Sequence, residues 1–421
     1  MSTDVGQLDR GRIRELFDLR SAYNAASGGG YHGDPYPQFH RLRETGPVHP
    51  GTVHELVGYS GPASFQGLPF PDRPHFSAFS YALCDRAFRD DETFASSPEP
   101  LDRAGSIGID SSMLNMGGRE HRRYRGLVQP SFVPSRARWW IERWIASTVD
   151  QLITGFQDEG RADLNVDFCA AIPMLTITGS FGIPVTDALD LRASIRQSAG
   201  RHGMEEFLRI LAPVVAARRE APEDDLISVL VQAGLTDTEG VTERLSDAEI
   251  YSFSYLLLAA GSGTTWKQMG ITLAALLARP SLLAAVREDR SLLRAAIEES
   301  VRWAPTDPMF SRHVARDVVY DGVEMPAGSV LHLCLGAANR DPARWDRPDE
   351  YDPLRPAMPS LAFGNGPHVC LGMHVARAEM AVGIGALLDR LPDLRLDPDA
   401  EEPRIIGMYE RGATNIRVRF G

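Results

Sequence analysis

The longest regular pattern of apolar residues in the chain runs from Asp247 to the break at Arg279-Pro280 and has helical periodicity. Ser246 and Glu249 precede it with the spacing of a capping box, a signal that starts helices. At 1.5 Å per residue this helix would be roughly 50 Å long. A helix of that length crosses a whole domain. The pattern therefore predicts a central helix in one large, mostly helical fold.

Shorter patterns predict the remaining elements. Helical periodicity dominates from about residue 118 to residue 200, and returns in three further segments: Gln38–Thr45, a helix from about Ser291, and Met373–Leu391. Alternating or short apolar runs predict strands at Val318–Val323, Val330–Leu335 and Asn415–Phe420. Gly- and Pro-rich stretches predict loops at Ala26–Pro37 and Ser96–Gly118. We therefore expect a mainly α fold with small β-sheets, as a single domain over residues 1–421 in which residues 1–33 are partly flexible.

The composition narrows the choice of partners. Of 421 residues 43% are hydrophobic, which is ordinary for a globular protein, and the formal net charge of -12 argues against nucleic acid as the main partner. The N-terminal sequence has no apolar segment typical of a signal peptide. The longest apolar run, Tyr255–Ala260, is far short of the roughly 20 residues that span a bilayer. We expect a cytoplasmic protein without a membrane partner.

The middle of the predicted central helix is unusual. Gly261-Ser262-Gly263-Thr264-Thr265 is poor in helix formers, and each glycine costs about 1 kcal/mol relative to alanine. Such a weakness predicts either the close approach of a ligand or a local opening of the helix.

Of the four cysteines, Cys370 has a special setting. The four are scattered without a CxxC pair, so neither a zinc site nor a disulfide framework is expected. Gly364 and Gly366 allow a tight turn before Cys370, which then falls at the start of a helix, where backbone N–H groups favour a thiolate. Gly372 leaves room for a flat macrocycle close to the backbone, and Phe363 is placed to shield the sulfur from water. The alternative is a buried structural cysteine at a helix cap.

The stretch from Phe363 to Gly372 matches the signature FxxGxxxCxG, with His368 two residues before the cysteine, and so resembles the cytochrome P450 family. The resemblance extends from about Asp34 to the C-terminus. It implies the cytochrome P450 fold with its long central helix over the haem, and haem b (iron protoporphyrin IX) as the cofactor. Cys370 is then the ligand of the iron, with Phe363, Gly364 and Gly372 beside the haem.

Two further motifs agree with this resemblance. Glu299 and Arg302 form an ExxR motif, which in the family makes a buried network with an arginine at the position of Arg355. The segment from Ala260 to Thr265 resembles the family's oxygen-binding segment. It implies that Ala260 and Gly261 lie against the haem and that Thr264 is the catalytic alcohol. The usual acid before this threonine is replaced by Gly263, which leaves the proton relay open.

A set of cations matches the positions that hold the haem propionates in the family. The set consists of His121, Arg125, Arg312 and His368. Arginine is suited to carboxylates because it donates two parallel hydrogen bonds. For His121 or Arg125 alone, a solvated surface position is the alternative.

The resemblance implies a haem-thiolate monooxygenase that acts on a small, largely apolar substrate. Because the chain carries no flavin or nicotinamide signature, electrons are expected from a separate ferredoxin and ferredoxin reductase. Four arginines either dock that ferredoxin or are merely solvated: Arg119, Arg122, Arg123 and Arg377. Two alternatives remain open, a peroxide-using enzyme, which Gly263 favours, and a non-catalytic haem-thiolate sensor.

The resemblance also predicts where the substrate pocket lies. The expected lining segments are Leu101–Met116, Leu256–Thr264, Pro308–Ser311 and Glu410–Asn415. Glu410 and Arg411 either orient an oxygenated substrate or pair with each other. Compared with the family, the segment Leu56–Phe76 is longer and Val185–Asp224, which carries the two helices that roof the pocket, is shorter.

Overall fold

The computed structural model describes residues 9–19, 28–63, 70, 72–97, 107–108, 111–196, 201–236 and 242–421. The predicted flexibility of residues 1–33 falls partly outside these ranges, as do parts of the expected loops at 26–37 and 96–118 and of the long segment 56–76. Helices make up most of the regular structure, and the sheets are small. The expectation of a mainly α fold is confirmed.

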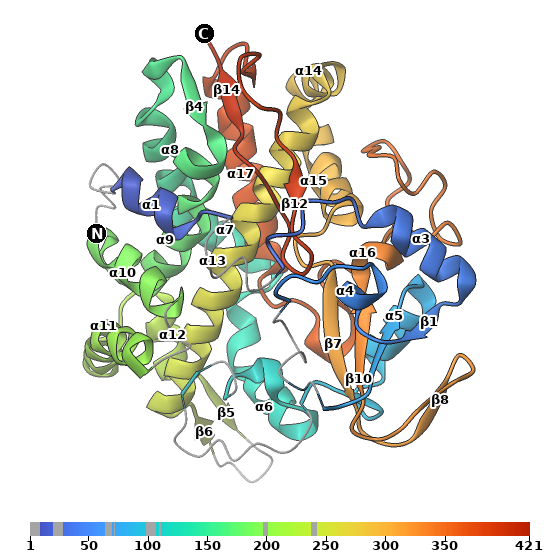
Figure 1. Ribbon diagram of the computed structural model, residues 1–421. Helices are drawn as coiled ribbons and strands as arrows, with labels where there is room; N and C mark the ends of the chain where they lie inside the picture. The colour runs from blue at the N-terminus through green and yellow to red at the C-terminus, as the bar shows by residue number, and fades with distance from the viewer. Residues whose placement is uncertain are drawn as a thin grey trace.

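Helix α13 (Asp247–Leu277) is the central element, as predicted (Figure 1). The hydroxyl of Ser246 accepts a hydrogen bond from the Glu249 N–H, and the Glu249 carboxylate accepts one from the Ser246 N–H at 2.7 Å, which completes the capping box. Helices α8 to α12 lie on one side of α13, and the sheet that contains β7 and β10 lies on the other.

Helix α13 continues without a break through Gly261–Thr265, so the predicted alternative of a local opening is wrong. The backbone hydrogen bonds of a helix need no side chain, and the hydroxyls add bonds to the carbonyls four residues earlier, as Thr264 does to Ala260 at 2.8 Å. The predicted close approach of a ligand stays a prediction, but a side chain of the protein does approach the helix at Gly261. A Cβ on Gly261 would lie 2.2 Å from Cδ1 of Ile177 in α9 (Ala171–Ser180).

The other helices of eight or more residues in the described ranges surround α13 or flank the sheet. They are α3 (Tyr36–Thr45), α5 (Tyr81–Arg89), α6 (Gly118–Val128), α8 (Ala146–Thr154), α10 (Val185–Arg196), α11 (Arg201–Glu220), α14 (Pro280–Glu288), α15 (Ser291–Trp303) and α17 (Met373–Arg390). The shorter ones are α1 (Arg10–Leu16), α4 (Val53–Leu56), α7 (Ala137–Trp140), α12 (Leu226–Gln232) and α16 (Leu335–Ala338). Helices α10 and α11 occupy the segment predicted to roof the pocket.

The largest sheet has the strand order β1-β2-β10-β7-β3. Its strands are β1 (Val48–Pro50), β2 (His75–Ala78), β10 (Val330–Cys334), β7 (Met309–Val314) and β3 (Phe94–Ala95). The smaller sheets are formed by β11 (Arg395–Leu396), β14 (Arg417–Arg419) and β4 (Arg161–Asp163), by β12 (Ile405–Ile406) with β13 (Gly412–Ala413), and by β5 (Gly234–Thr236) with β6 (Thr242–Arg244). β10 agrees with the predicted strand at 330–335, and β14 lies within the one at 415–420.

The predicted strand at 318–323 is in fact a hairpin of β8 (Val318–Tyr320) and β9 (Val323–Met325). Asp321 and Gly322 connect the strands with φ values of 51° and 81°. Two successive positive φ values are typical of the tight turn that Asp-Gly favours. The apolar run was read as continuous because this two-residue turn sits inside it.

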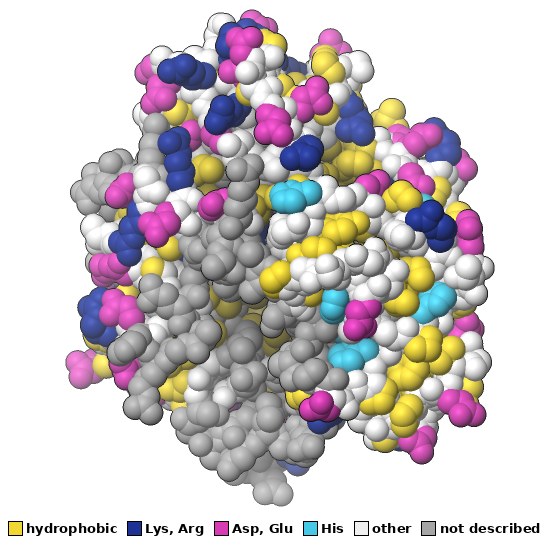
Figure 2. Space-filling model, in the orientation of Figure 1, with side chains coloured by type: hydrophobic (Ala, Val, Ile, Leu, Met, Phe, Trp, Pro, Cys, Tyr) yellow, Lys and Arg dark blue, Asp and Glu magenta, His cyan; other side chains and the backbone are white. Residues whose placement is uncertain are grey.

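Charged side chains of both signs are mixed over the face shown in Figure 2, where Lys and Arg lie among Asp and Glu. Within the described ranges no single helix has both the length and the apolarity to cross a membrane. Two pairs of successive helices, each pair sharply bent at a short break, meet both criteria when the two helices of a pair are taken together.

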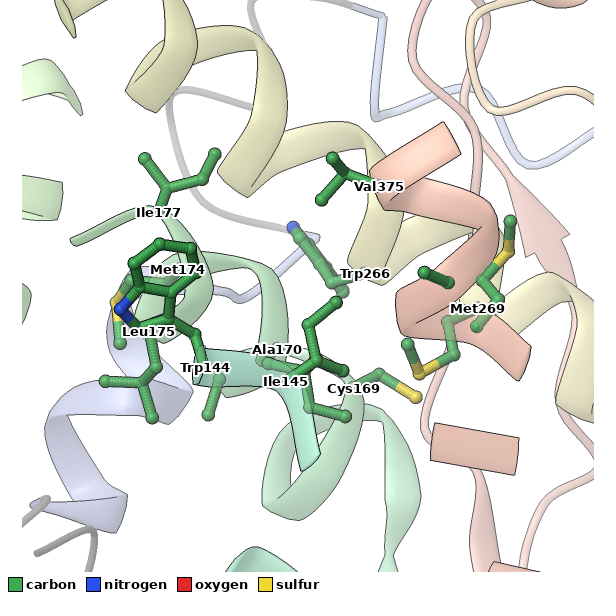
Figure 3. Close-up of a cluster of buried hydrophobic side chains, with 14 of the residues drawn as sticks. Trp144, Ile145, Cys169, Ala170, Met174, Leu175, Ile177, Trp266, Met269 and Val375 are labelled. Carbon is green, nitrogen blue, oxygen red and sulfur yellow. The ribbon is translucent and has the colours of Figure 1, made fainter. Parts of the chain in front are cut away.

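The core holds α13 against α9 and α17. Trp266 and Met269 of α13 belong to the same buried cluster as Met174 of α9, Val375 of α17 and Trp144 (Figure 3). Trp266 and Met269 are fully buried. Burial of side chains this large fixes the spacing between the central helix and the helix that follows Cys370, and the candidate site lies between those two helices.

Candidate functional site

A largely apolar cavity of about 260 Å³ lies between α13 and the segment around Cys370, with α6 and β7 completing its wall. Its lining includes Leu256, Val301, Phe310 and Leu371. A cavity with mostly apolar walls and few polar groups is typical of a site for a small organic molecule or a cofactor.

Cys370 faces this cavity. Its side chain is exposed into the cavity, whereas Cys84, Cys169 and Cys334 are buried. The Cys370 N–H donates to the Phe363 carbonyl at 2.8 Å, which closes the turn before the cysteine. Only Cys370 among the cysteines is therefore placed to bind a ligand.

The turn before Cys370 requires glycine. Gly364 and Gly366 have φ values of 68° and 70°, which side chains rarely allow. A Cβ on Gly366 would also lie 2.2 Å from the Phe88 carbonyl oxygen. Gly372, at the cap of α17, has no atom within 4 Å of where its Cβ would be, and it lines the cavity.

The backbone at the start of α17 lowers the pKa of Cys370, as predicted, but this effect does not decide the balance. Burial raises the pKa of the thiol, and this effect outweighs the hydrogen bond from the Gly372 backbone and the nearby charges of Arg125 and Arg377. The thiol is therefore the favoured form without a metal. A bound metal ion would displace the proton directly.

The ExxR motif forms the network that the resemblance implies. Arg302 donates two hydrogen bonds to the Glu299 carboxylate, at 2.7 and 2.8 Å, and Arg355 donates a third at 2.8 Å. The remaining donors of Arg302 reach the carbonyls of Asn339, Pro348 and Glu350. Glu299 and Arg302 are buried, and this satisfied network ties α15 to the segment that leads to Cys370.

Two of the four predicted cations are stacked histidines at the cavity wall. The rings of His121 and His368 lie 4.0 Å apart, and Ser96 is hydrogen-bonded to His368 at 2.8 Å. Burial lowers the pKa of His121 to about 4. His121 Nε2 is buried and has no hydrogen-bond partner among the described residues, which is unusual for a polar atom.

The two arginines also line the cavity. Arg125 donates to the Val369 carbonyl at 2.7 Å. Arg312 is buried, donates to the Ser311 carbonyl at 2.9 Å and lies over the Phe88 ring. Burial lowers its pKa to about 10. Within the described ranges neither arginine has a carboxylate within ion-pair distance, so both are available to an anionic group in the cavity.

The central helix forms the opposite wall. Ala260, Gly261 and Thr264 line the cavity, while Gly263 is not part of its lining. The nearest atom to a Cβ on Gly263 is Nη1 of Arg192, at 3.9 Å. Arg192 is buried and donates to the Ser262 hydroxyl at 2.9 Å. A cation therefore stands beside the position where the family has an acid.

Asp307 is a cavity residue that the sequence analysis missed. Its Oδ1 is buried without a hydrogen-bond partner in the described part of the chain. Burial and the nearby Glu410 carboxylate raise its pKa to about 7, although Lys267 opposes the shift. In the sequence, an aspartate before Pro308 is typical of an ordinary loop. Its position next to the expected lining segment Pro308–Ser311 was the only indication that it lies at the cavity.

The predicted lining segments are partly confirmed. Met113, Leu256 and Phe310 line the cavity, but no residue of Glu410–Asn415 appears in its described lining. Residues 101–106 lie outside the described ranges. Glu410 forms an ion pair with Lys267, and Arg411 donates to the Gly407 carbonyl at 2.7 Å. The predicted Glu410–Arg411 pair is therefore wrong, because a buried lysine on α13 takes the carboxylate instead.

Two of the four arginines predicted to dock a ferredoxin are paired within the chain. Arg123 forms ion pairs with Glu243 and Glu249, and Arg377 forms one with Glu298. Arg119 and Arg122 are exposed on α6. Neither forms an ion pair within the described ranges.

Together these features fit a flat cofactor with an iron centre and acidic edges. Such a group requires a sulfur that faces the cavity, an open surface over Gly372 and polar partners at one edge. Arg125, Arg312 and the unpartnered Nε2 of His121 supply those partners.

Comparisons with known proteins agree with this geometry. The family model for cytochrome P450 matches residues 201–408. Cytochrome P450 107B1 of Saccharopolyspora erythraea is 33% identical over 75% of this chain and 79% of its own length. The cytochrome P450 monooxygenase PikC of Streptomyces venezuelae is 31% identical over 94% of both chains.

Solved structures show the same fold. The cytochrome P450 PksS of Bacillus subtilis superposes with a TM-score of 0.79 at 26% identity, over 94% of this chain and 99% of that one. P450BioI, solved in complex with an acyl carrier protein that carries hexadec-9Z-enoic acid, has a TM-score of 0.76 at 26% identity, over 92% of this chain and 99% of that one.

Proposed function

Because this chain belongs to the cytochrome P450 family of haem monooxygenases, we propose that it inserts one oxygen atom from O2 into a small, largely apolar substrate, with electrons from a separate ferredoxin and ferredoxin reductase. The observation that carries the proposal is the position of Cys370. It is the one cysteine of the four that faces the cavity, and two arginines at the edge of that cavity have no carboxylate partner among the described residues.

In this proposal the residues around the cavity hold the haem. Cys370 Sγ would ligate the iron, and His121, Arg125, Arg312 and His368 would hold the propionates. Phe363, Gly364 and Gly372 would contact the cofactor from the segment around the cysteine, and Ala260 and Gly261 would contact it from α13. The haem supplies the iron chemistry that activates dioxygen, and a thiolate ligand favours cleavage of the O–O bond.

The proposed catalytic residue is Thr264, whose side chain lines the cavity. Its hydroxyl hydrogen is directed to the Ala260 carbonyl, so its oxygen is left to accept a hydrogen bond from a group in the cavity. Gly263 has no side chain that could transfer a proton, and Arg192 donates a hydrogen bond to the neighbouring Ser262 hydroxyl. Protons must therefore reach the cavity by another route than an acid at position 263.

The proposed electron donor docks on the exposed face of α6. With Arg123 and Arg377 neutralised by their own ion pairs, Arg119 and Arg122 are the cations left for an acidic ferredoxin.

A second candidate function is peroxide-driven oxidation, which Gly263 favours because the usual acid is missing. Turnover of one substrate by the haem-loaded enzyme, with ferredoxin, reductase and NADPH or with hydrogen peroxide alone, tests both candidates. We expect the ferredoxin system to give the faster product formation. Product with peroxide alone would support the second candidate, and no product with either oxidant source would contradict both.

A further inference from the structure

The cavity contains a carboxyl group whose electrostatic needs the protein does not meet. Among the described residues of the lining, only Asp307 and Glu379 are acidic. Glu379 has a hydrogen bond with Thr176, whereas Asp307 Oδ1 is buried and has none. A buried polar atom without a partner is destabilising, so such atoms are rare in native proteins.

Among the described residues the charges that act on Asp307 are those of Lys267 and Glu410, and these leave one negative charge uncompensated. Lys267 is 1% exposed and forms an ion pair with Glu410, and neither residue is part of the cavity lining. One ammonium and two carboxylates leave a net charge of -1 when all three are ionised. This cluster combines residues from α13, the segment before β7 and the segment before β13, so the backbone holds it in place.

The polar groups next to Asp307 are already committed to other partners. Gln268 accepts from the Thr306 N–H at 2.9 Å and donates to the Ser300 hydroxyl at 3.3 Å. The Thr306 hydroxyl donates to the Arg411 carbonyl at 2.7 Å. Neither group donates to Asp307, and Asp307 lines the cavity, so the cavity is the side from which a partner can reach its carboxylate.

We propose that Asp307 binds a protonated amino group of the substrate, and that this enzyme therefore oxidises a largely apolar molecule with one basic nitrogen. This inference rests on the proposed monooxygenase function. An ammonium group in a cavity of low dielectric constant restores the missing charge and donates the missing hydrogen bond. A neutral analogue leaves Asp307 unpaired, or forces it to take up a proton, which agrees with its pKa of about 7.

Binding of matched probes to the haem-loaded enzyme tests this proposal. The probes are three phenylbutyl compounds that end in a dimethylamino, a trimethylammonium or a tert-butyl group. The last two have nearly the same shape, and the trimethylammonium nitrogen has no lone pair with which to ligate iron. Affinity is measured from the change in the haem absorption band.

We expect the wild type to bind both cations about tenfold or more tightly than the tert-butyl compound. Asp307→Asn should bring the three affinities together and leave the tert-butyl affinity nearly unchanged. Glu379→Gln, which replaces the other carboxyl group of the lining by an amide of the same size, is the matched control and should keep the preference.

Equal affinity of the wild type for the trimethylammonium and tert-butyl probes would overturn the proposal, whether or not Asp307→Asn retains haem. The same preference in Asp307→Asn as in the wild type would also overturn it. If Asp307→Asn instead binds all probes normally but forms less product per electron, the carboxyl serves a proton path. Failure of the monooxygenase function itself is distinguishable, because the carbon monoxide complex of the reduced wild type would then lack the thiolate band.

Discussion

The chemistry of the cavity depends on a few of its side chains, among them Cys370, Thr264 and Asp307. The cysteine, the four cations and the threonine were identified because their spacing matches a family pattern, and the structure brings them to one cavity. Asp307 was missed because its meaning depends on tertiary neighbours. Lys267, Glu410 and Asp307 lie far apart in the sequence, so no local pattern predicts that folding brings their charges close together.

At the residue scale, removal of a cation from the edge of the cavity should weaken haem binding. Arg312→Ala and Arg125→Ala each leave a partly buried propionate without its partner, at a cost on the order of 2–5 kcal/mol. The rate of haem transfer to an excess of an apo-haem acceptor protein measures the effect. Arg122→Ala, on the exposed face of the same helix as Arg125, is the control and should behave as the wild type. Unchanged haem loss in both cavity variants would refute their assignment.

Gly263 gives a second prediction at this scale. In Gly263→Glu the new carboxylate falls near the Arg192 guanidinium, since a Cβ there lies 3.9 Å from Nη1. We expect it to restore a proton route and raise the fraction of electrons recovered as product. Thr264→Ala should lower that fraction. If the wild type already recovered nearly all of its electrons as product, Gly263 would not limit proton transfer, and this prediction would be contradicted.

At the scale of elements, periodicity predicted the helices well because each buries an apolar stripe against the core. Helix α13 begins at the predicted capping box and ends close to the predicted break. The hairpin at 318–325 was misjudged because a two-residue turn hardly interrupts an apolar run. The weak stretch of α13 stays helical because the packing around it, including Ile177 against Gly261, holds it in place.

Helix α17 carries a buried acid that should make stability depend on pH. Burial raises the pKa of Glu379 from 4.5 to about 8, so the folded protein keeps a proton that the unfolded chain loses above pH 4.5. Its contribution is therefore most favourable below that pH, and stability falls as the pH rises from about 4.5 to about 8.

Glu379→Gln keeps the size of the side chain and removes the titration. Between pH 5 and pH 8 the wild type should lose on the order of 1–3 kcal/mol of stability relative to this variant. The denaturant midpoints of both haem-loaded proteins at the two pH values measure the difference. Parallel pH profiles would show that Glu379 does not hold a proton in the folded state.

At the scale of the whole molecule, the net charge of -12 opposes the approach of an acidic ferredoxin, so docking needs a local basic surface. The sequence suggested four arginines for it. Ion pairs formed by folding neutralise Arg123 and Arg377, and no sequence pattern predicts partners such as Glu243 or Glu298.

Reversal of charge at Arg119 and Arg122, the two arginines of this set without an ion pair in the described ranges, should slow electron delivery. We expect Arg119→Glu combined with Arg122→Glu to raise the KM for ferredoxin about tenfold and to reduce the salt dependence of the rate, because charges at a rim act mainly on association. Binding of carbon monoxide after chemical reduction should not change. Arg138→Glu, at an exposed position on α7, is the control. A KM equal to that of the wild type would place the docking surface elsewhere.

The proposed bond between Cys370 and the haem iron can be tested directly by spectroscopy. The absorption spectrum of the reduced carbon monoxide complex reports whether a thiolate ligates the iron. The wild type should show the band typical of the family, Cys370→Ser should lose it, and Cys84→Ser, Cys169→Ser and Cys334→Ser should keep it. An unchanged band in Cys370→Ser would contradict the central claim that this cysteine holds the haem.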